Sequence, residues 1–306
     1  MEAAHHHRSA ATQRVDGDHD QSNKELSNKP EQPLQQRQGQ HMGEQQHVPT
    51  QDCQLKQYHQ PQCAMKSQRL SAKSNCNLGI LQSNVGWIDD GIINSAQRML
   101  KQRFPEKNGL QNTLLSQQQQ FVVVRQNSVQ IHNIGNHWVT TSSDEQGSIH
   151  LYDSLVRYKL SSHLEQQIAS IYRSNEKEIT VSIRAVQQQR GGNDCELFAI
   201  AFAYDVASGI DPEYVTYIQS DMRKHLFSCV KKGYITPFPR YFQGLTRCKR
   251  SVASFAIYCV CRQPDSFGRL MIQCNCCDEW FHCKCVCLKP PGRTFYCPTC
   301  SSEQGC

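Results

Sequence analysis

The chain has 306 residues, 17 cysteines and a formal net charge of +6, a length that suits one domain of ordinary size and one small module. Its polar start does not resemble a signal peptide and no apolar run approaches the ~20 residues of a membrane helix, so the dense cysteines indicate metal binding or catalysis in a reducing compartment rather than disulfides. The mild positive charge gives no argument for nucleic-acid binding, and we expect neither a nucleic-acid nor a membrane partner.

Residues 1–77 contain no Phe, Trp or Ile and are rich in Gln, His, Asn and Ser. Such a composition cannot bury enough apolar surface to offset the conformational entropy lost on folding, so we expect this Gln/His-rich segment to be disordered. Its run His5–His7 is open to two interpretations, a weak metal site or a low-complexity accident.

The folded pattern begins near Val85. In "WIDDGIINSAQRMLKQRF" the apolar residues recur close to helical spacing, and Asp89 or Asp90 is a suitable N-cap. The next apolar runs are rich in β-branched residues and predict four strands. These runs are "FVVV", "SVQIHNI", "HWVTTSS" and "SIHLYDS". The last two flank "DEQG", which is a good hairpin turn.

Two further helices and a strand follow the hairpin. "SSHLEQQIASIY" predicts an amphipathic helix capped by Ser161 or Ser162, and "EITVSIRAV" alternates as a strand. "CELFAIAFAYDVAS" is apolar nearly all round, so it predicts a central, buried helix that Gly209 closes. This order of elements predicts an α+β fold.

The composition divides the chain into four parts. After the segment 1–77 we expect one domain at 78–243, a linker at 244–254 that lacks periodicity, and a separate cysteine-rich module at 255–306. The basic "RCKR" in the linker is either a nuclear import signal or a solvated charge cluster.

Cys195 stands where a polar, glycine-rich loop turns into the apolar helix. With Asp194 as N-cap it lies in the first helical turn, where the partial positive charge of the helix end stabilises a thiolate. A cysteine nucleophile needs a histidine base and usually an orienting carboxylate. If the hairpin turn centres on residue 145, His137 and Asp153 lie opposite each other and share a face.

Other interpretations of these residues remain open. His137 and Asp153 could each be a structural polar residue at a strand end. His132 and His150 are competing bases, although the pattern places no carboxylate opposite either of them.

The motifs "WIDDGIIN", "GNHW", "IHLYDS" and "QQQRGGNDC", in this order, resemble the Ulp1-like cysteine proteases, which process ubiquitin-like modifiers and are related to the adenoviral protease. The resemblance covers roughly 85–243. The matching residues are Trp87, Asp90, Ile93, Asn94, His137, Trp138, Asp153, Gln189, Asp194 and Cys195. Domains of this type also occur in reading frames derived from mobile elements.

The resemblance implies a papain-like, Ulp1-type cysteine protease domain that acts on a ubiquitin-like protein precursor or conjugate. It implies Cys195 as the nucleophile, His137 as the general base and Asp153 as its orienting partner. The Gln189 side chain and the Cys195 backbone N–H would hold the oxyanion. Trp138 either shapes the narrow slot for a Gly-Gly tail or is a core aromatic residue.

Glu196 departs from the family pattern, which has glycine directly after the nucleophile. A carboxylate beside the thiolate would raise the pKa of the cysteine and oppose a developing oxyanion, whereas a carboxylate in solvent would be screened. The sequence therefore leaves a second hypothesis, a catalytically inactive protease-fold scaffold that binds chromatin.

The cysteine-rich module holds eight soft ligands in four pairs, which suit two closed tetrahedral sites for structural Zn²⁺. The pairs are Cys259 and Cys261, Cys274 and Cys277, His282 and Cys285, and Cys297 and Cys300. Histidine as the fifth ligand resembles a PHD finger, since a RING finger has it fourth.

The PHD resemblance implies that the two sites interleave. One zinc would be held by Cys259, Cys261, His282 and Cys285, and the other by Cys274, Cys277, Cys297 and Cys300. Four cysteines are left over, namely Cys276, Cys283, Cys287 and Cys306. Cys276 or Cys283 could replace a neighbouring ligand if the register slipped.

PHD fingers bind peptides, many of them histone H3 tails, so the resemblance implies a nuclear location in preference to the cytoplasm. "LMIQ" is the strand to which such a peptide would add. Tyr258, Met271 and Trp280 match an aromatic cage for methyl-lysine, and Asp265 replaces a cage tyrosine, which favours a lower methylation state. Alternatively, Tyr258 and Trp280 cover the small core, to which we assign Phe281 and Phe295.

Overall fold

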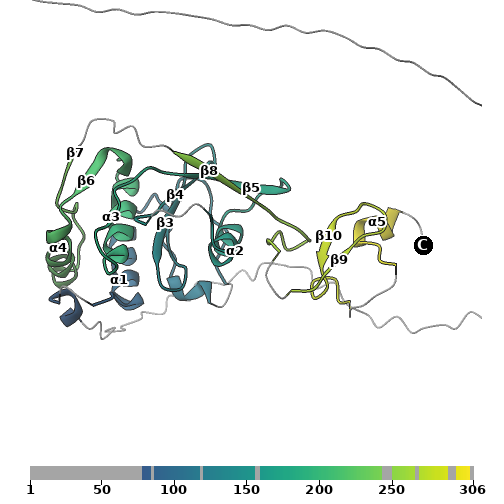
Figure 1. Cartoon of the computed structure of the whole chain (residues 1–306), viewed down its shortest axis with the longest axis horizontal. Coiled ribbons are helices and arrows are strands. Elements are labelled where there is room, and N and C mark those ends of the chain that lie inside the picture. The colour runs from purple at the N-terminus through teal and green to yellow at the C-terminus, as the bar shows by residue number, and fades with distance from the viewer. Residues whose placement is uncertain are drawn as a thin grey trace, which may run out of the picture. The chain divides into compact units, whose positions relative to one another are not determined.

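The computed structural model describes residues 78–83, 86–117, 120–155, 159–242, 250–265, 269–288 and 294–303 (Figure 1). The segment 1–77 that we expected to be disordered lies outside the described residues, as do 244–249 of the expected linker and Cys306. Among the described residues, no helix combines the length and the apolar character that a membrane crossing requires.

A six-stranded mixed sheet organises the larger part of the described chain, with the strands in the order β1-β2-β3-β4-β5-β8. The strands are β1 (Asn108–Gly109), β2 (Ser128–Asn133), β3 (Trp138–Ser143), β4 (Ile149–Tyr152), β5 (Glu178–Ile183) and β8 (Ser251–Ala256). β2, β3 and β4 form an antiparallel meander, β1 and β5 add in parallel, and β8 closes the edge antiparallel to β5. The predicted α+β fold class is confirmed.

Helices cover both faces of this sheet, as Figure 1 shows. The helices are α1 (Asp90–Arg103), α2 (Ser162–Ile171), α3 (Cys195–Ala207) and α4 (Gln219–Lys232). Alternate strand residues face opposite sides, so Trp138 joins the core beneath α1, α3 and α4, whereas Val139 joins the core beneath α2. α3 is buried on nearly all sides, as its sequence predicts, and the Thr140 hydroxyl of β3 bonds to the Ala199 carbonyl of α3 at 2.7 Å.

Capping residues set the helix starts. The Asp89 side chain accepts a hydrogen bond from the Ile92 N–H, and the Ser161 side chain accepts one from the Leu164 N–H, so the first alternative holds at both predicted N-caps. α4 is an element that the sequence analysis does not contain. It ends at Gly233, whose φ of 75° is the left-handed conformation that favours glycine after a helix.

The predicted strand "FVVV" is wrong. Residues 121–124 have no strand partner, and only the Val124 N–H makes a backbone bond, to the Ile171 carbonyl at 3.0 Å. Phe121 is buried, but Val122 is exposed. The β-branched residues of this run therefore do not mark a buried strand.

The hairpin of β3 and β4 forms with a different register from the one we expected. Ser142 pairs with His150 and Thr141 with Leu151, so the turn centres on residue 146 rather than 145. The displacement places His137 and Asp153 diagonally across the two strands instead of directly opposite. Diagonal neighbours still share a face, and the expected proximity of these two side chains survives the change.

The remaining elements are short. They are the 3₁₀ helices η1 (Leu78–Leu81), η2 (Thr113–Ser116) and η3 (Pro212–Tyr214), the paired strands β6 (Val215–Tyr217) and β7 (Arg240–Phe242), the paired strands β9 (Met271–Gln273) and β10 (Trp280–His282), and α5 (Pro298–Glu303). β9, β10 and α5 belong to the cysteine-rich module.

Residues 251–254, which we expected in a linker, are part of β8. All six residues of β8 pair with β5, from Glu178 opposite Ala256 to Ile183 opposite Ser251. Only Phe255 of this strand is buried. An edge strand with one buried side chain shows no hydrophobic alternation, which is why its sequence reads as a linker.

Candidate active site and metal centres

His137 and Asp153 form a buried hydrogen-bonded pair. The His137 Nε2–H donates to Asp153 Oδ1 at 2.6 Å, and the same oxygen accepts the Leu155 N–H at 2.8 Å. His137 Nδ1 is buried and has no hydrogen-bond partner among the described residues. Asp153 thus fixes the tautomer and leaves Nδ1 available as a base.

Cys195 is the first residue of α3 and is buried. The backbone N–H of Trp138, the residue after His137, contacts its sulfur. The start of β3 therefore lies against the candidate nucleophile, one residue after the candidate base.

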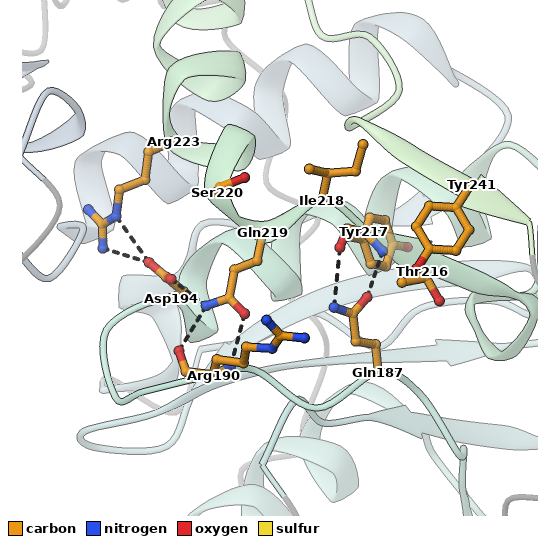
Figure 2. A pocket seen from close by; sticks show the side chains of 10 residues that line it. All are labelled: Gln187, Arg190, Asp194, Thr216, Tyr217, Ile218, Gln219, Ser220, Arg223 and Tyr241. Atoms are coloured by element: carbon orange, nitrogen blue, oxygen red, sulfur yellow. Dashed lines mark hydrogen bonds and ion pairs between the residues drawn. The ribbon is translucent and has the colours of Figure 1, made fainter.

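Asp194 occupies the N-cap position of α3 but makes no side-chain cap bond. Its carboxylate instead accepts bonds from Arg223 Nε at 3.0 Å and Gln219 Nε2 at 2.6 Å (Figure 2). The expected position of Asp194 is correct, and its expected capping bond is replaced by these contacts with α4.

Glu196 points into the protein. It is 1% exposed, its Oε1 accepts the Ile88 N–H at 3.0 Å, and its Oε2 accepts the Cys195 thiol hydrogen at 3.3 Å. Burial of the thiol, and then the negative charge of Glu196, raise the pKa of Cys195 to about 12. Burial also raises the pKa of Glu196 itself. Of the two orientations that the sequence allows, the structure has the one in which solvent does not screen the carboxylate.

Gln189 is buried at the end of the loop that precedes α3. Its Oε1 accepts the Ser154 hydroxyl at 2.7 Å, and its Nε2 donates to the Gly191 carbonyl at 2.9 Å. The amide that the resemblance assigns to the oxyanion is thus held by its own loop.

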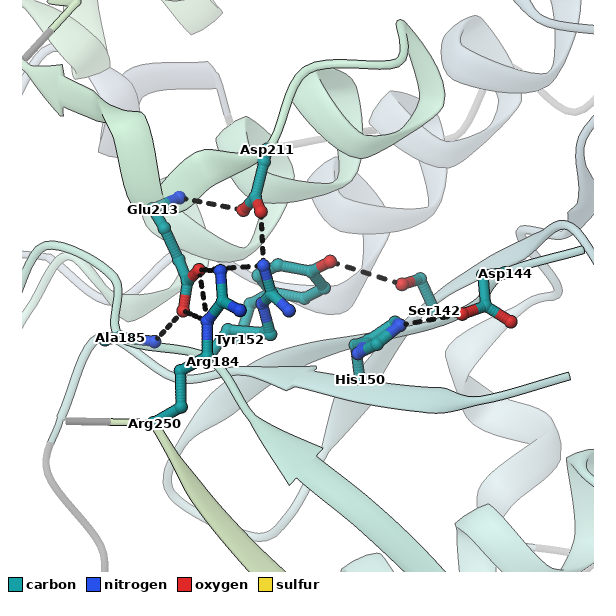
Figure 3. Close-up of polar contacts among 9 residues, drawn as sticks. All are labelled: Ser142, Asp144, His150, Tyr152, Arg184, Ala185, Asp211, Glu213 and Arg250. Carbon is teal, nitrogen blue, oxygen red and sulfur yellow. Dashed lines mark hydrogen bonds and ion pairs between the residues drawn. The ribbon is translucent and has the colours of Figure 1, made fainter. Parts of the chain in front are cut away.

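The two competing histidines have other surroundings. His132 is a core residue that bonds to Gln167 at 2.9 Å and Thr141 at 2.7 Å, and burial lowers its pKa to about 4. His150 lies 3.3 Å from Asp144 (Figure 3), so the sequence analysis missed a carboxylate that the tight turn brings to it.

The two tryptophans of the motifs differ in exposure. Trp138 is buried in the core beneath α3, which agrees with its alternative interpretation as a core residue. Trp87 is 54% exposed, and its indole N–H donates to Asn193 Oδ1 at 3.0 Å. Two contacts therefore join the segment before α1 to the start of α3. Trp87 bonds to Asn193 in the loop before Cys195, and the Ile88 N–H bonds to Glu196 in the first turn of α3.

The eight expected metal ligands fall into two groups, and within each group the ligand atoms lie within 4.8 Å of one another. The groups are Cys259, Cys261, His282 and Cys285, and Cys274, Cys277, Cys297 and Cys300. This is the interleaved pairing that the resemblance implies, and neither Cys276 nor Cys283 replaces a ligand. His282 Nδ1 faces the Cys261 sulfur at 3.3 Å, and four thiol or imidazole ligands fit a tetrahedral metal ion.

The four expected peptide-binding residues lie on and around β9 and β10. Trp280 pairs with Gln273 and His282 pairs with Met271, so Met271 and Trp280 share a face. Trp280 is 42% exposed. Tyr258 forms a bridge with Gln263, and Asp265 is exposed. Phe281 and Phe295 pack edge to face at 5.6 Å, as expected of core residues.

No family model matches the chain. Curated relatives match over short segments. The COMPASS component SPP1 of Saccharomyces cerevisiae is 40% identical over 50 residues, which is 15% of this chain and 14% of the relative. The human lysine-specific demethylase 7A is 40% identical over 53 residues, which is 16% of this chain and 6% of the relative. The chain thus spans a small fraction of the length of these relatives.

Among solved structures, the chain is similar to the SUMO protease Ulp1 with its catalytic cysteine oxidised to a sulfinic acid. That likeness has a TM-score of 0.40 and 15% identity, and covers 51% of this chain and 82% of the other. A second similar structure is the Ulp1 protease domain in complex with Smt3, the yeast ortholog of SUMO. It has a TM-score of 0.39 and 15% identity, and the match covers 51% of this chain and 81% of the other.

Proposed function

We propose that the chain is a cysteine peptidase that cleaves precursors or conjugates of ubiquitin-like proteins, with Cys195 as its nucleophile. The observation that carries this proposal is the buried 2.6 Å bond between His137 and Asp153, which leaves Nδ1 of His137 without a partner among the described residues. A buried imidazole nitrogen without a hydrogen-bond partner costs free energy, and a catalytic role is one explanation for such a group. Accepting the proton of Cys195 is such a role.

In this mechanism His137 Nδ1 takes the thiol proton while Asp153 stabilises the imidazolium. The thiolate attacks the carbonyl carbon of the scissile bond, and His137 gives the proton to the leaving amine. Water, activated by the same nitrogen, then hydrolyses the thioester. The Cys195 N–H and Gln189 Nε2 stabilise the oxyanion, which requires Gln189 to exchange the Gly191 carbonyl for substrate. Such a donor typically contributes ~2.7–4 kcal/mol to transition-state stabilisation.

Glu196 supports a second candidate, an inactive protease-fold scaffold. Its buried carboxylate accepts the thiol hydrogen, which stabilises the thiol form over the nucleophilic thiolate. In a scaffold this arrangement would be permanent. In an enzyme, substrate binding would have to break it or protonate Glu196.

For the cysteine-rich module we propose two structural zinc ions and binding of a histone H3 tail, in the nucleus. Support for zinc comes from the two closed ligand groups of thiols and one imidazole. Support for peptide binding comes from the exposed Trp280 on the same face as Met271.

The experiment that separates the two candidates is covalent labelling with ubiquitin and ubiquitin-like proteins that carry a C-terminal electrophile. We expect the parent chain to form one adduct, Cys195→Ala to form none, and the matched control Cys229→Ala to label like the parent. If only Glu196→Gly is labelled and the parent is inert, the natural chain is a scaffold. If no variant is labelled, both the peptidase and its modifier class are wrong.

A further inference from the structure

A cleft of about 580 Å³ lies between the loop that leads to Cys195 and the segment that joins β6 to α4 (Figure 2). Two of its lining residues, Arg190 and Asp194, are chain neighbours of Gln189 and Cys195. The candidate triad does not use this cleft.

Two glutamines hold the walls of the cleft together. Gln187 accepts the Tyr217 N–H at 2.6 Å and donates to the Tyr217 carbonyl at 3.2 Å. Gln219 accepts the Arg190 N–H at 2.9 Å and donates to the Arg190 carbonyl at 2.9 Å. Each side chain therefore satisfies both backbone groups of one residue on the opposite wall, which makes the cleft preorganised.

The charged side chains that line the cleft differ in whether they have an ion-pair partner. Asp194 is neutralised by Arg223, which lies at 2.9 Å. The Arg190 guanidinium makes no hydrogen bond or ion pair with the described residues, although the backbone of Arg190 is fixed by Gln219. Arg190 is exposed to solvent and its backbone is fixed, so the N–H donors of its guanidinium are accessible to an anion.

Other lining groups suit the rest of a polypeptide. Thr216 lines the cleft, and its hydroxyl is buried without a hydrogen-bond partner among the described residues. Tyr241 and Ile218 are 55% and 41% exposed and offer apolar surface to an aliphatic stem.

We propose that this cleft binds an acidic segment of a polypeptide and that Arg190 pairs with a glutamate or aspartate carboxylate. A single guanidinium matches one carboxylate in a bidentate manner, whereas phosphate groups are usually bound by clusters of arginines. In the proposed peptidase the segment belongs to the substrate. The binding itself does not depend on catalysis, so the two proposals fail separately.

The test measures peptide binding to the full chain carrying Cys195→Ala, by fluorescence anisotropy at low ionic strength. The probes are two labelled peptides of glycine and serine, one with four central glutamates and the other with four glutamines. We expect the glutamate peptide to bind about tenfold more tightly, the value for one charged hydrogen-bonded pair. Arg190→Ala should abolish this preference and Arg190→Glu should reverse it.

Arg173→Ala is the matched control, because it removes an exposed positive charge elsewhere and should leave the preference unchanged. Equal binding of the two peptides to the parent, or an undiminished preference in Arg190→Ala, would overturn the proposal. A phosphoserine peptide that binds more tightly than the glutamate peptide, with the same dependence on Arg190, would contradict the assignment to a carboxylate.

Discussion

Glu196 is the residue on which the chemistry of this chain depends. Its carboxylate forms a bond to the thiol of Cys195 and another to the backbone of Ile88, so it links the nucleophile to the segment before α1. From the sequence, the departure from glycine was visible, but the direction of the side chain was not. Rotation about its side-chain bonds is decided by the Ile88 N–H, which lies 108 positions away in the chain.

We predict that Glu196→Gly lowers the pKa of Cys195, because it removes the negative charge that disfavours the thiolate. Like charges some 6 Å apart at an effective dielectric of about 20 repel by roughly 3 kcal/mol, which corresponds to at most about two pKa units. The pH at which Cys195 reacts half-maximally with iodoacetamide should fall accordingly, and Glu196→Gln should recover part of the change. Unchanged reactivity in both variants would mean that burial alone sets this pKa.

His132 makes the stability of the chain depend on pH. Burial lowers its pKa from 6.5 to about 4, so between these values the unfolded chain binds the proton and the folded chain does not. The stability that depends on neutral His132 is present above pH 6.5 and is lost as the pH falls toward 4.

We predict that stability falls by ~2 kcal/mol more in the parent than in His132→Gln between pH 7 and 5, at 1.36 kcal/mol per unit. Urea denaturation at the two pH values measures this difference. Burial raises the pKa of Asp205 to about 6, so its titration stabilises the fold as the pH falls. Such groups contribute equally to the parent and to His132→Gln, and their effect cancels in the comparison. Equal losses in the two proteins would show that His132 is protonated in the fold.

At the scale of the elements, the long periodic helices and the hairpin were predictable, whereas β8 and α4 were not. α3 is apolar nearly all round and is buried on nearly all sides, so its sequence is a strong signal. β8 buries only Phe255, and its position depends on distant partners. Arg250 donates to Glu213 Oε2 at 2.8 Å from Nε, and Glu213 also accepts the Ala185 N–H and bonds to Arg184 (Figure 3).

In the candidate site, too, contacts between segments that are distant in the sequence could not be predicted. The hairpin spacing sufficed to expect His137 beside Asp153, although the register was displaced, and the resemblance in the motifs added Cys195. Their neighbours could not be found this way, since Gln219 and Arg223 lie on α4 and act through Asp194. Such contacts join segments that share no local pattern.

If β8 is an integral strand rather than a linker, Phe255→Ala should destabilise the sheet domain by about 3 kcal/mol, the usual cost of truncating a buried phenylalanine. The matched control Val252→Ala, on the same strand but 68% exposed, should change stability by less than about 0.5 kcal/mol. Urea denaturation followed by tryptophan fluorescence measures both. Similar small effects would restore the linker interpretation.

At the scale of the whole molecule, two kinds of stabilisation operate. The sheet and its helices bury two large apolar cores. The cysteine-rich module has a core of four buried residues, of which three are expected metal ligands. So small a core cannot fold the module by apolar burial, and metal binding would have to supply the folding free energy.

We predict that elemental analysis of the purified chain gives two zinc ions per molecule, in accord with the two ligand groups. Strong chelation should abolish amide protection in β9 and β10 and leave that of α3 intact. Hydrogen exchange read by mass spectrometry measures both segments at once. One zinc per chain, or protection that survives chelation, would contradict the ligand pairing.

The measurement that tests the central claim most directly is turnover of ubiquitin-like proteins whose C-terminal glycine carries a fluorogenic amine. The parent should release the amine from at least one of them, and Cys195→Ala and His137→Ala should each lose turnover by ~10³-fold or more, because members of a catalytic unit fail together. Cys229→Ala should retain it. Equal release by the parent and Cys195→Ala, or no release by either the parent or Glu196→Gly, would contradict the assignment of Cys195 as the nucleophile of a peptidase.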